Sequence, residues 1–172
     1  MSGISLGLFR NPPAEGAVAF WQSWYLDRNG SFAYPGSFVS GPTDTIMGRF
    51  GWGDPDTGIV LNTRTSATQL QGFVARLFGT WTHVYNAPDP NNTARTLWYL
   101  RAGLPCPLIK AGAYWARFAA GARAGDQVYA SLTDGSCISG YNAGAIQSEA
   151  TPWYVANTCA PNGLALISTW SI

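Results

Sequence analysis

Two sequence patterns in this chain could take part in nucleophilic catalysis. The single histidine, His83, lies in the run T-W-T-H-V-Y, and Gly3-Ile4-Ser5-Leu6-Gly7 matches the G-x-S-x-G pattern of hydrolases. A nucleophile elbow needs a strand before its serine and a helix after it. Only two residues precede the match and Pro12-Pro13 soon follows it, so neither element fits. We expect Ser5 to be no nucleophile and His83 to be a packed strand residue.

The carboxylates give no clearer indication of catalysis. Most of the nine Asp and Glu residues stand beside Gly, Pro or Asn, where Asp has an ordinary role in turns. Asp54-Pro55-Asp56 lacks the remaining spacing of a calcium loop, and the glycines form no phosphate-binding loop. The sequence alone leaves open a glycosidase-like pair of carboxylates across a groove. We expect no enzyme, with no catalytic residues, no cofactor and no metal site.

The composition is poor in charge and rich in aromatic side chains. Of 172 residues, 11% are charged and 47% are hydrophobic, and the chain holds eight Trp, eight Tyr and eight Phe. An ordinary soluble domain carries roughly 25% charged residues. Interface cores lose charge and gain aromatics, so this balance favours a surface largely covered by partners. The alternative is that some of the aromatics fill the core of a β-barrel.

Three classes of partner or environment receive little support from the sequence. The nine Arg residues and the single Lys are scattered along the chain without a run or stripe, so we expect no direct nucleic-acid binding. No run of 18 apolar residues occurs, so we expect no membrane span. The N-terminal stretch lacks a basic region followed by a long apolar region, so we expect no secretory signal.

The three cysteines are widely separated. Cys106, Cys137 and Cys159 form no C-x-x-C motif, and an odd count argues against both a disulfide framework and a zinc site. We expect the three cysteines to act as small buried hydrophobic residues in a reducing environment. A single Cys106–Cys159 or Cys137–Cys159 bond stays open at this stage.

Residues 1–45 differ from the rest of the chain. They contain Pro12-Pro13, Pro35-Gly36 and Gly41-Pro42, and this density of Pro and Gly argues against a long helix or a central strand. Disordered tails are poor in aromatics, whereas this segment is rich in them. We therefore predict an extended N-terminal arm that packs on a neighbour. The residues from 14 to 26 could instead form a short helix or strand within the fold.

Residues 46–172 have the pattern of short strands and tight turns. Strands are expected at 46–52, 58–62, 70–78, 81–85, 96–101, 108–110, 113–118, 127–132, 136–139, 154–157 and 164–170. The step Thr133-Asp134-Gly135 predicts a hairpin, and residues 85–93 a long polar loop. Many short strands with Gly and Pro turns predict an all-β fold. We expect a single β-sandwich or barrel, jelly-roll-like, over residues 46–172.

Alternation along the strands predicts which side chains are buried. Val128 and Ala130 should share one face, opposite Tyr129 and Ser131, since successive side chains of a strand point to opposite faces. The residues expected in the core are Phe50, Phe73, Trp115, Val128, Leu132, Leu164 and Leu166.

Four segments resemble those of a known family in their order and approximate spacing. They read S-G-P-T-D-T-I-M-G-R-F-G-W-G-D-P at 40–55, Q-G-F-V-A-R at 71–76, G-A-Y-W-A-R-F at 112–118 and A-G-D-Q-V-Y-A-S-L-T-D-G at 124–135. This order resembles the structural cement, or capsid decoration, proteins of tailed bacteriophages. The resemblance covers more than half of the chain, and it transfers no catalytic residue.

The resemblance implies a protein added to the outer surface of the virion capsid after assembly in the host cytoplasm. Its partners would be the major capsid protein and neighbouring copies of itself, as a dimer or trimer, and it would bridge capsid subunits around the packaged DNA. Many copies with modest contacts can cross-link a shell by avidity. The aromatic residues expected at this interface are Phe20, Trp21, Trp24, Tyr25, Phe32, Tyr34 and Phe38.

Two other function classes compete with a capsid decoration protein. One is another virion component, such as a tail, fibre or connector subunit, which would show repeats or intertwined trimers. The other is a carbohydrate-binding β-module, in which an exposed Trp52, Trp98 or Trp153 would stack on sugars. Tryptophans at core-like strand positions fit packing better than sugar binding.

Overall fold

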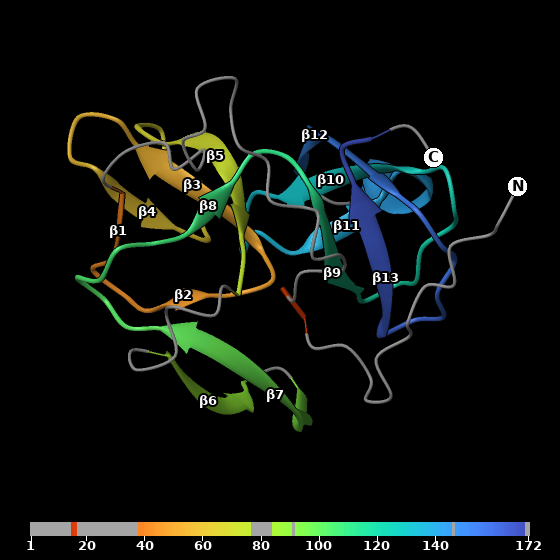
Figure 1. The fold of residues 1–172 in the computed structure, drawn as a ribbon, viewed down its shortest axis with the longest axis horizontal. Helices are drawn as coiled ribbons and strands as arrows, with labels where there is room; N and C mark the ends of the chain where they lie inside the picture. The colour runs from red at the N-terminus through yellow and green to blue at the C-terminus, as the bar shows by residue number, and fades with distance from the viewer. Residues whose placement is uncertain (1–14, 17–37, 77–83, 91, 146, 171–172) are drawn as a thin grey trace, which may run out of the picture.

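The chain is an all-β protein. The computed structural model describes residues 15–16, 38–76, 84–90, 92–145 and 147–170 (Figure 1). Within these ranges the regular elements are strands and one 3-10 helix, η2 (Gly140–Ala145). The strands form three sheets, one of which closes into a barrel. The predicted all-β fold is thereby confirmed, although its strands are divided among three sheets in place of one jelly-roll-like sandwich.

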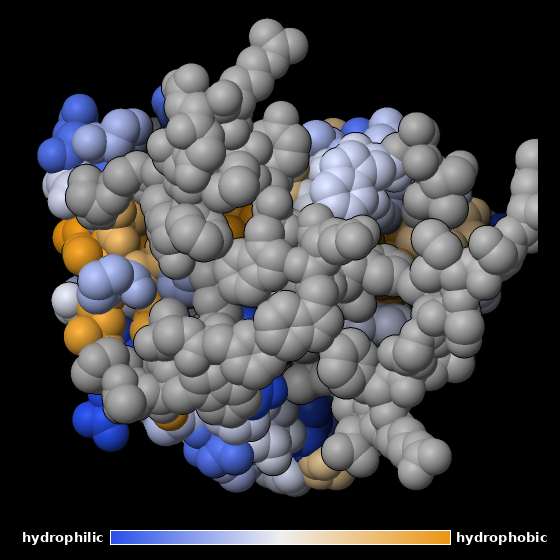
Figure 2. Space-filling model, in the orientation of Figure 1, coloured by the Kyte–Doolittle hydropathy of each residue, from blue (hydrophilic) through white to orange (hydrophobic). Residues whose placement is uncertain are grey.

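One sheet has five short strands in the order β1-β4-β3-β5-β8. Their bounds are β1 (Val39–Ser40), β4 (Ile59–Leu61), β3 (Phe50–Asp54), β5 (Gln69–Val74) and β8 (Leu108–Ile109). The outer pair β1 and β4 is parallel, and the other pairs are antiparallel. This sheet lies on the left in Figure 1. Figure 2 shows small apolar areas beside strongly hydrophilic ones on this side of the molecule.

The second sheet closes on itself as a five-stranded barrel in the order β10-β11-β9-β13-β12. Its strands are β9 (Ala113–Phe118), β10 (Gln127–Ser131), β11 (Cys137–Ser139), β12 (Ser148–Val155) and β13 (Gly163–Ser168). The longest ladder joins β13 to β9, from Gly163 opposite Phe118 to Ser168 opposite Ala113. Strands β10 and β11 form the predicted hairpin around Thr133-Asp134-Gly135, which is confirmed.

The third sheet corrects one sequence prediction. It contains β2 (Thr45–Ile46), β7 (Asn92–Leu100) and β6 (Val84–Asp89), so the polar loop predicted at 85–93 is wrong. Cross-strand contacts outweigh the turn-like composition, since Tyr85 stacks on Tyr99 with ring centroids 5.3 Å apart. Pro88 is tolerated because β6 is an edge strand, where a missing N–H interrupts no inner ladder.

Two apolar clusters lie on opposite faces of β5. Phe73 belongs to the larger cluster, which fills the barrel and the space between it and the sheet, and Val74 belongs to the smaller one. On β3, Phe50 and Trp52 face the larger cluster. The intervening Gly51 lies so close to the smaller cluster that a Cβ there would be 2.7 Å from Leu108. The absence of a side chain at this glycine lets both clusters pack against one thin sheet.

The predicted core is confirmed only in part. Phe50, Phe73 and Val128 are buried. The expected difference between Val128 and Ala130 on one face and the half-buried Tyr129 on the other is seen, whereas Ser131, predicted to share the face of Tyr129, is also buried. Leu132 is half-buried against the larger cluster. The register of the β9–β13 pair is opposite to the prediction. Half-buried Trp115, Leu164 and Leu166 point away from the barrel interior, which receives the smaller alternating residues Ala116 and Ala165 together with Tyr114, Phe118 and Ile167.

The folded body begins earlier in the chain than residue 46. Val39 and Ser40 pair with β4, and Thr45 pairs with Leu100 of β7. Within residues 1–37, the structure describes only Glu15 and Gly16, and both lie against the body. The chain on either side of Gly41-Pro42 is therefore held in sheets.

All three cysteines are free thiols. Cys106 and Cys137 are buried and Cys159 is half-buried, which excludes both disulfides left open above. Burial raises the pKa of Cys106 to about 12. The cysteines act as small apolar side chains, as the sequence predicted.

Candidate interaction site at the junction of the sheets

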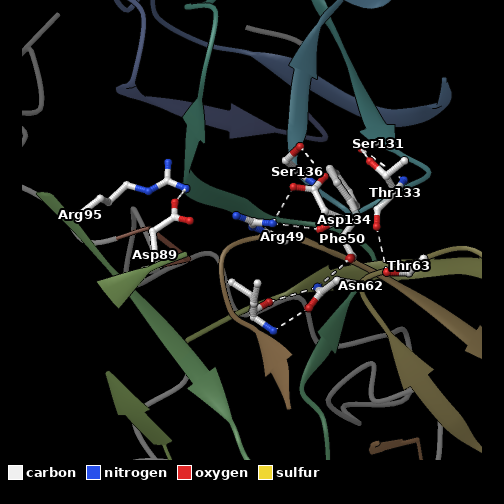
Figure 3. A network of polar contacts seen from close by, with 11 residues as sticks. Arg49, Phe50, Asn62, Thr63, Asp89, Arg95, Ser131, Thr133, Asp134 and Ser136 are labelled. Atoms are coloured by element: carbon white, nitrogen blue, oxygen red, sulfur yellow. Dashed lines mark hydrogen bonds and ion pairs between the residues drawn. The ribbon is translucent and has the colours of Figure 1, made fainter. Parts of the chain in front are cut away.

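The β10–β11 hairpin joins the barrel to the five-stranded sheet. The Phe50 amide donates to the Gly135 carbonyl at 2.7 Å, and the Arg64 amide donates to the Leu132 carbonyl at 2.8 Å. The Thr63 hydroxyl donates to the Thr133 carbonyl at 2.8 Å. These contacts hold one end of the barrel against β3 and the turn after β4 (Figure 3). The junction is therefore formed largely by backbone groups.

A half-buried ion pair reinforces this junction. The Arg49 guanidinium lies 2.7 Å from the Asp134 carboxylate, and Arg49 is 5% exposed. Burial alone would raise the pKa of the Asp134 carboxyl. The Arg49 charge and hydrogen bonds from Ser136 and Ser131 instead hold that pKa below its ordinary value. The pair links the residue that precedes β3 to the tip of the barrel hairpin.

Asn62 connects two further backbone segments. Its side-chain oxygen accepts from the Ile46 amide at 2.6 Å, and its side-chain nitrogen donates to the carbonyls of Ile46 and Phe50 at 3.2 and 3.0 Å. An amide side chain that donates and accepts in this way satisfies buried backbone groups that no ladder reaches. Asn62 therefore ties β2 to β3.

The third sheet supplies a second ion pair. Arg95 of β7 contacts the Asp89 carboxylate of β6, which is 2% exposed. Figure 3 shows this pair on the side of Arg49 away from Asp134. Both Arg49 Nε and Arg95 Nε are buried and lack a hydrogen-bond partner. Two arginines of one region thus retain unused donor capacity.

Glu15 and Gly16 lie in the same region. The Gly16 amide donates to the Trp115 carbonyl at 2.7 Å, and the Arg76 amide donates to the Gly16 carbonyl at 2.9 Å. Arg117 Nε lies 3.4 Å from a Glu15 carboxylate oxygen. Burial raises the pKa of the Glu15 carboxyl, and the charges of Arg49, Arg117 and Arg95 oppose that rise. The N-terminal region is therefore fixed to the body at this point.

The outer surface of the barrel carries exposed aromatic side chains. Among the described residues the exposed large hydrophobic residues are Tyr141 at 66%, Tyr154 at 43% and Trp170 at 42%. The Arg123 guanidinium lies 3.9 Å from the centre of the Tyr141 ring. Tyr, Trp and Arg are the residue types that dominate binding energy at protein interfaces. We call these four residues the barrel patch.

Most residues predicted for the partner interface lie outside the described residues. These are Phe20, Trp21, Trp24, Tyr25, Phe32 and Tyr34. Phe38 is described, and it lies half-buried against the smaller cluster, where its ring would be 2.6 Å from a Cβ at Gly53. Phe38 therefore packs on its own body, and its part in a partner interface stays a prediction.

The residues considered for catalysis are placed as follows. Ser5 and His83 lie outside the described residues. Asp54 accepts hydrogen bonds from the Asp56 amide and the Thr57 hydroxyl, both at 2.9 Å, which is the turn role expected for it. Within the described ranges, no group of three or more His, Cys, Asp or Glu side chains could hold a metal ion. In the same residues no helix is long and apolar enough to span a membrane.

The tryptophans proposed for sugar stacking are largely inaccessible. Trp52 is 0% exposed and Trp153 is 1% exposed, both within the larger cluster. Trp98 is half-buried, and the Arg76 guanidinium lies 3.8 Å from the centre of its ring. The sugar-binding prediction is therefore wrong for Trp52 and Trp153, because they fill the core.

The sequence reasoning missed the charged junction. Arg49 and Arg117 stand inside apolar, aromatic runs, I-M-G-R-F-G-W and A-Y-W-A-R-F. A buried charge is costly unless it is paired. An arginine in such a run, within a chain of few charges, is a signal that could have directed attention to carboxylate partners. Glu15 gives no comparable signal, since it lies between Pro12-Pro13 and Gly16.

The all-β body carries exposed aromatic side chains, and comparison with known families gives its class. The chain is a structural protein of the phage virion, associated with the capsid. Residues 25–169 match the XM1 gp53 minor capsid protein family, and the chain belongs to that family. Comparison with curated proteins gave no match. The expected phage capsid association is thereby confirmed at this level.

Proposed function

We propose that the protein is a capsid decoration, or cement, protein. It binds the outer surface of the phage head, bridges subunits of the major capsid protein and contacts neighbouring copies of itself. The role is structural, without catalysis or a cofactor. It stabilises the DNA-filled shell because each copy adds contacts between subunits that the packaged DNA pushes apart.

The barrel patch is the observation that supports this proposal best. One end of the barrel is covered by the five-stranded sheet, to which the 132–136 hairpin is bonded. The exposed aromatic residues Tyr141, Tyr154 and Trp170 belong to the barrel and the segment just after it. The Arg123 guanidinium is stacked on Tyr141 and forms no ion pair among the described residues. Exposed aromatic side chains and one cation unpaired among the described residues are suited to a protein partner that offers apolar side chains and a carboxylate.

A firmly joined body suits a bridging protein. The Arg49–Asp134 pair and backbone hydrogen bonds connect the barrel to the five-stranded sheet, so a pull on the barrel patch is transmitted to that sheet. The predicted interface aromatics between residues 20 and 34 would add a second contact region. Two weak contacts on one body bind a shell more tightly than either does alone, because the second contact forms at high effective concentration.

The test compares binding of variants to phage heads that lack the protein. Tyr141→Ala/Tyr154→Ala removes two aromatics of the barrel patch, and Trp21→Ala/Trp24→Ala removes two predicted aromatics of the N-terminal region. Ser66→Ala, an exposed residue of the β4–β5 connection, is the control. Quantitative gels give the number of copies bound per head, and cryo-electron microscopy gives their position.

Each aromatic pair should reduce the affinity for heads by about tenfold or more, since truncating a central interface residue costs about 1–2 kcal/mol. Heads that lack the protein should release DNA at a lower temperature than heads saturated with it. Normal binding by both double variants, or density for the protein on the tail or inside the shell, would reject the proposed role.

A further inference from the structure

Glu15 and Gly16 occupy a well-defined seat on the body. We use the word seat for Gly48, Arg76, Trp115 and Arg117. Two backbone hydrogen bonds hold Gly16 between Trp115 and Arg76, and Arg117 contacts the Glu15 carboxylate. The seat joins the strand β9 of the barrel to residues beside β3 and β5 of the sheet. It is a place where a short peptide segment bonds to both parts of the body.

The seat accepts a narrow choice of residues. Gly16 has φ +79°, and a Cβ on it would lie 2.9 Å from the Gly48 amide nitrogen. Gly48 has φ +81°, and a Cβ there would lie 2.2 Å from Glu15 Cγ. Neither position tolerates a side chain without displacing the other segment. The seat is therefore shaped for an occupant that carries Gly directly after its Glu.

The arginines around the seat favour an anion, and burial of the Glu15 carboxyl opposes its ionisation more strongly. Arg49, Arg95 and Arg117 all act on the Glu15 carboxylate. Asp134 and Asp89 pair with the first two, and Glu15 supplies the carboxylate for the third. Without Glu15, the half-buried Arg117 would lose its carboxylate partner and, among the described residues, keep only its hydrogen bond to the Asn162 carbonyl. The Nε donors of Arg49 and Arg95 are also unused. An empty seat would thus lose the Arg117–Glu15 contact and both backbone hydrogen bonds of Gly16.

The covalent connection does not dictate which copy supplies the occupant. Between Gly16 and Phe38 lie the 21 residues from 17 to 37, which can span at most roughly 70 Å when extended. The seat residues fall within the family-matched range of 25–169, and the occupant falls outside it. The occupant thus lies before the matched range and is joined to the body by a connection whose length is enough to reach a neighbouring molecule.

We propose that the seat is an interaction site between copies, filled in the assembled state by Glu15 and Gly16 of a second copy. The contacts are the same whichever copy supplies the segment, so exchange costs little beyond the tether, as in domain swapping. The balance then depends on the local concentration of neighbours relative to the effective concentration of the tethered segment. The inference rests on the proposed function only for the place where copies meet.

The experiment forms a covalent bond between Glu15 and position 117 with a zero-length carbodiimide cross-linker. Arg117→Lys keeps the positive charge and supplies the reactive amine. The doubly substituted chain Glu15→Gln/Arg117→Lys has the amine but no Glu15 carboxylate. Mixed with the unmodified chain, it can form the 15–117 bond only between two copies. The two chains are refolded together from urea at about millimolar concentration, comparable with a tethered segment's effective concentration, and mass spectrometry identifies the bond.

We expect the mixture to give a cross-linked dimer with about half of the seats filled between copies at the matching concentration. The same mixture refolded and cross-linked at micromolar concentration should give no cross-linked dimer. The doubly substituted chain alone should give no 15–117 bond. If Arg117→Lys alone forms the bond within one chain while the mixture forms none, exchange is overturned. If Arg117→Lys forms no bond at all, the seat itself is overturned.

A second measurement avoids any change at position 117. Sedimentation of the unmodified chain should detect a dimer as the concentration rises from micromolar to millimolar. Glu15→Ala should abolish that dimer, because the alanine cannot satisfy the arginines. A monomer at every concentration, or a dimer that Glu15→Ala leaves intact, would overturn exchange. Neither the cross-linking nor the sedimentation experiment involves phage heads. A negative result in these two experiments can therefore be distinguished from a failure of the protein to bind heads.

Discussion

Gly135 lies directly against the backbone of Phe50. The Phe50 amide donates to the Gly135 carbonyl at 2.7 Å, and a Cβ on Gly135 would stand 2.2 Å from the Phe50 carbonyl oxygen. Gly135 also has φ +67°. The tip of the barrel hairpin can therefore approach β3 only because it carries no side chain. Asp134 immediately precedes Gly135 in the chain, so the same approach brings the Asp134 carboxylate to Arg49.

We expect Gly135→Ala to destabilise the protein strongly. The added methyl group meets backbone atoms that cannot rotate away, in addition to the roughly 1 kcal/mol cost of a positive φ. The total should exceed about 3 kcal/mol in the free energy of unfolding. Gly125→Ala is the matched control, since Gly125 has φ +89° with nothing near its Cβ position. Urea unfolding measures both, and similar losses for the two variants would contradict the close approach.

Phe73→Ala should test the larger cluster. Phe73 is fully buried and contacts the rings of Phe50, Tyr114 and Trp153, with centroids 5.4 to 6.0 Å apart. Truncating a buried Phe costs about 3–5 kcal/mol of unfolding free energy. Gln69→Ala on the same strand is exposed and should cost less than about 0.5 kcal/mol. A loss below about 1 kcal/mol for Phe73→Ala would exclude a core joining the barrel and the sheet.

Asp134→Asn should weaken the junction at neutral pH. Breaking a fully buried pair costs about 3–5 kcal/mol, but the Asp134 side chain is 41% exposed, so we expect about 1–2 kcal/mol after solvent screening. The folded state lowers the pKa of Asp134 from 3.8. The stability that Asp134 contributes is therefore present above 3.8 and is lost as the pH falls through the folded pKa. The stability difference between the unmodified chain and Asp134→Asn should shrink over that range in acid urea titrations.

Glu15 should show the opposite pH dependence. Its folded-state pKa is raised above 4.5, chiefly by burial. Its contribution is largest below 4.5 and is lost as the pH rises through the folded pKa. Glu15→Gln does not titrate and is the reference. The stability of the unmodified chain relative to Glu15→Gln should fall as the pH rises above 4.5. A relative stability that rises over this range would contradict the burial of the carboxyl.

The cysteines should differ in reactivity. Cys106 is buried with a pKa of about 12, and burial raises the pKa of Cys137 well above its ordinary value. Cys159 is half-buried, and its pKa is also raised by burial. At neutral pH an aromatic disulfide reagent should modify at most Cys159 in the native protein, slowly, since the thiolate is the reactive form. All three should react in urea. Rapid native labelling of Cys106 would exclude its place in the smaller cluster.

Local patterns were sufficient to locate most strands. Residues 113–118 form β9 with the predicted bounds, and 127–132 differs from β10 by one residue. Such strands are marked by apolar runs between Gly, Pro and Asp-Gly, which act through local backbone geometry. The loop prediction for residues 85–93 was wrong because their composition indicates turns. They form a strand because they pair with β7. The composition of one strand alone does not show which strand it pairs with.

The interaction site was less accessible to sequence reasoning. The sequence indicated an aromatic N-terminal segment and a partner-binding role, and the family match supports the capsid association. The ion pair Arg49–Asp134 and the contact of Glu15 with Arg117 join residues far apart in the chain, and the pair Arg95–Asp89 forms across neighbouring strands. Arg49 and Arg117 indicate that buried charges need partners, but only the packing of the three sheets determines which carboxylates these are.

The sequence by itself determined the all-β class, the β10–β11 hairpin and the role of the cysteines, because these depend on neighbouring residues and side-chain polarity. Only the tertiary structure decided which face of β9 and β13 turns inward. The interior of a five-stranded barrel is narrow. Ala116, Ala130 and Ala165 fill part of it beside the larger Tyr114, Phe118 and Trp153, and Trp115 is turned out. Hydrophobicity alone favours Trp115 for the core. Side chains alternate along β9, so a register that turned Trp115 inward would also turn Arg117 inward, and burying that charge is costly.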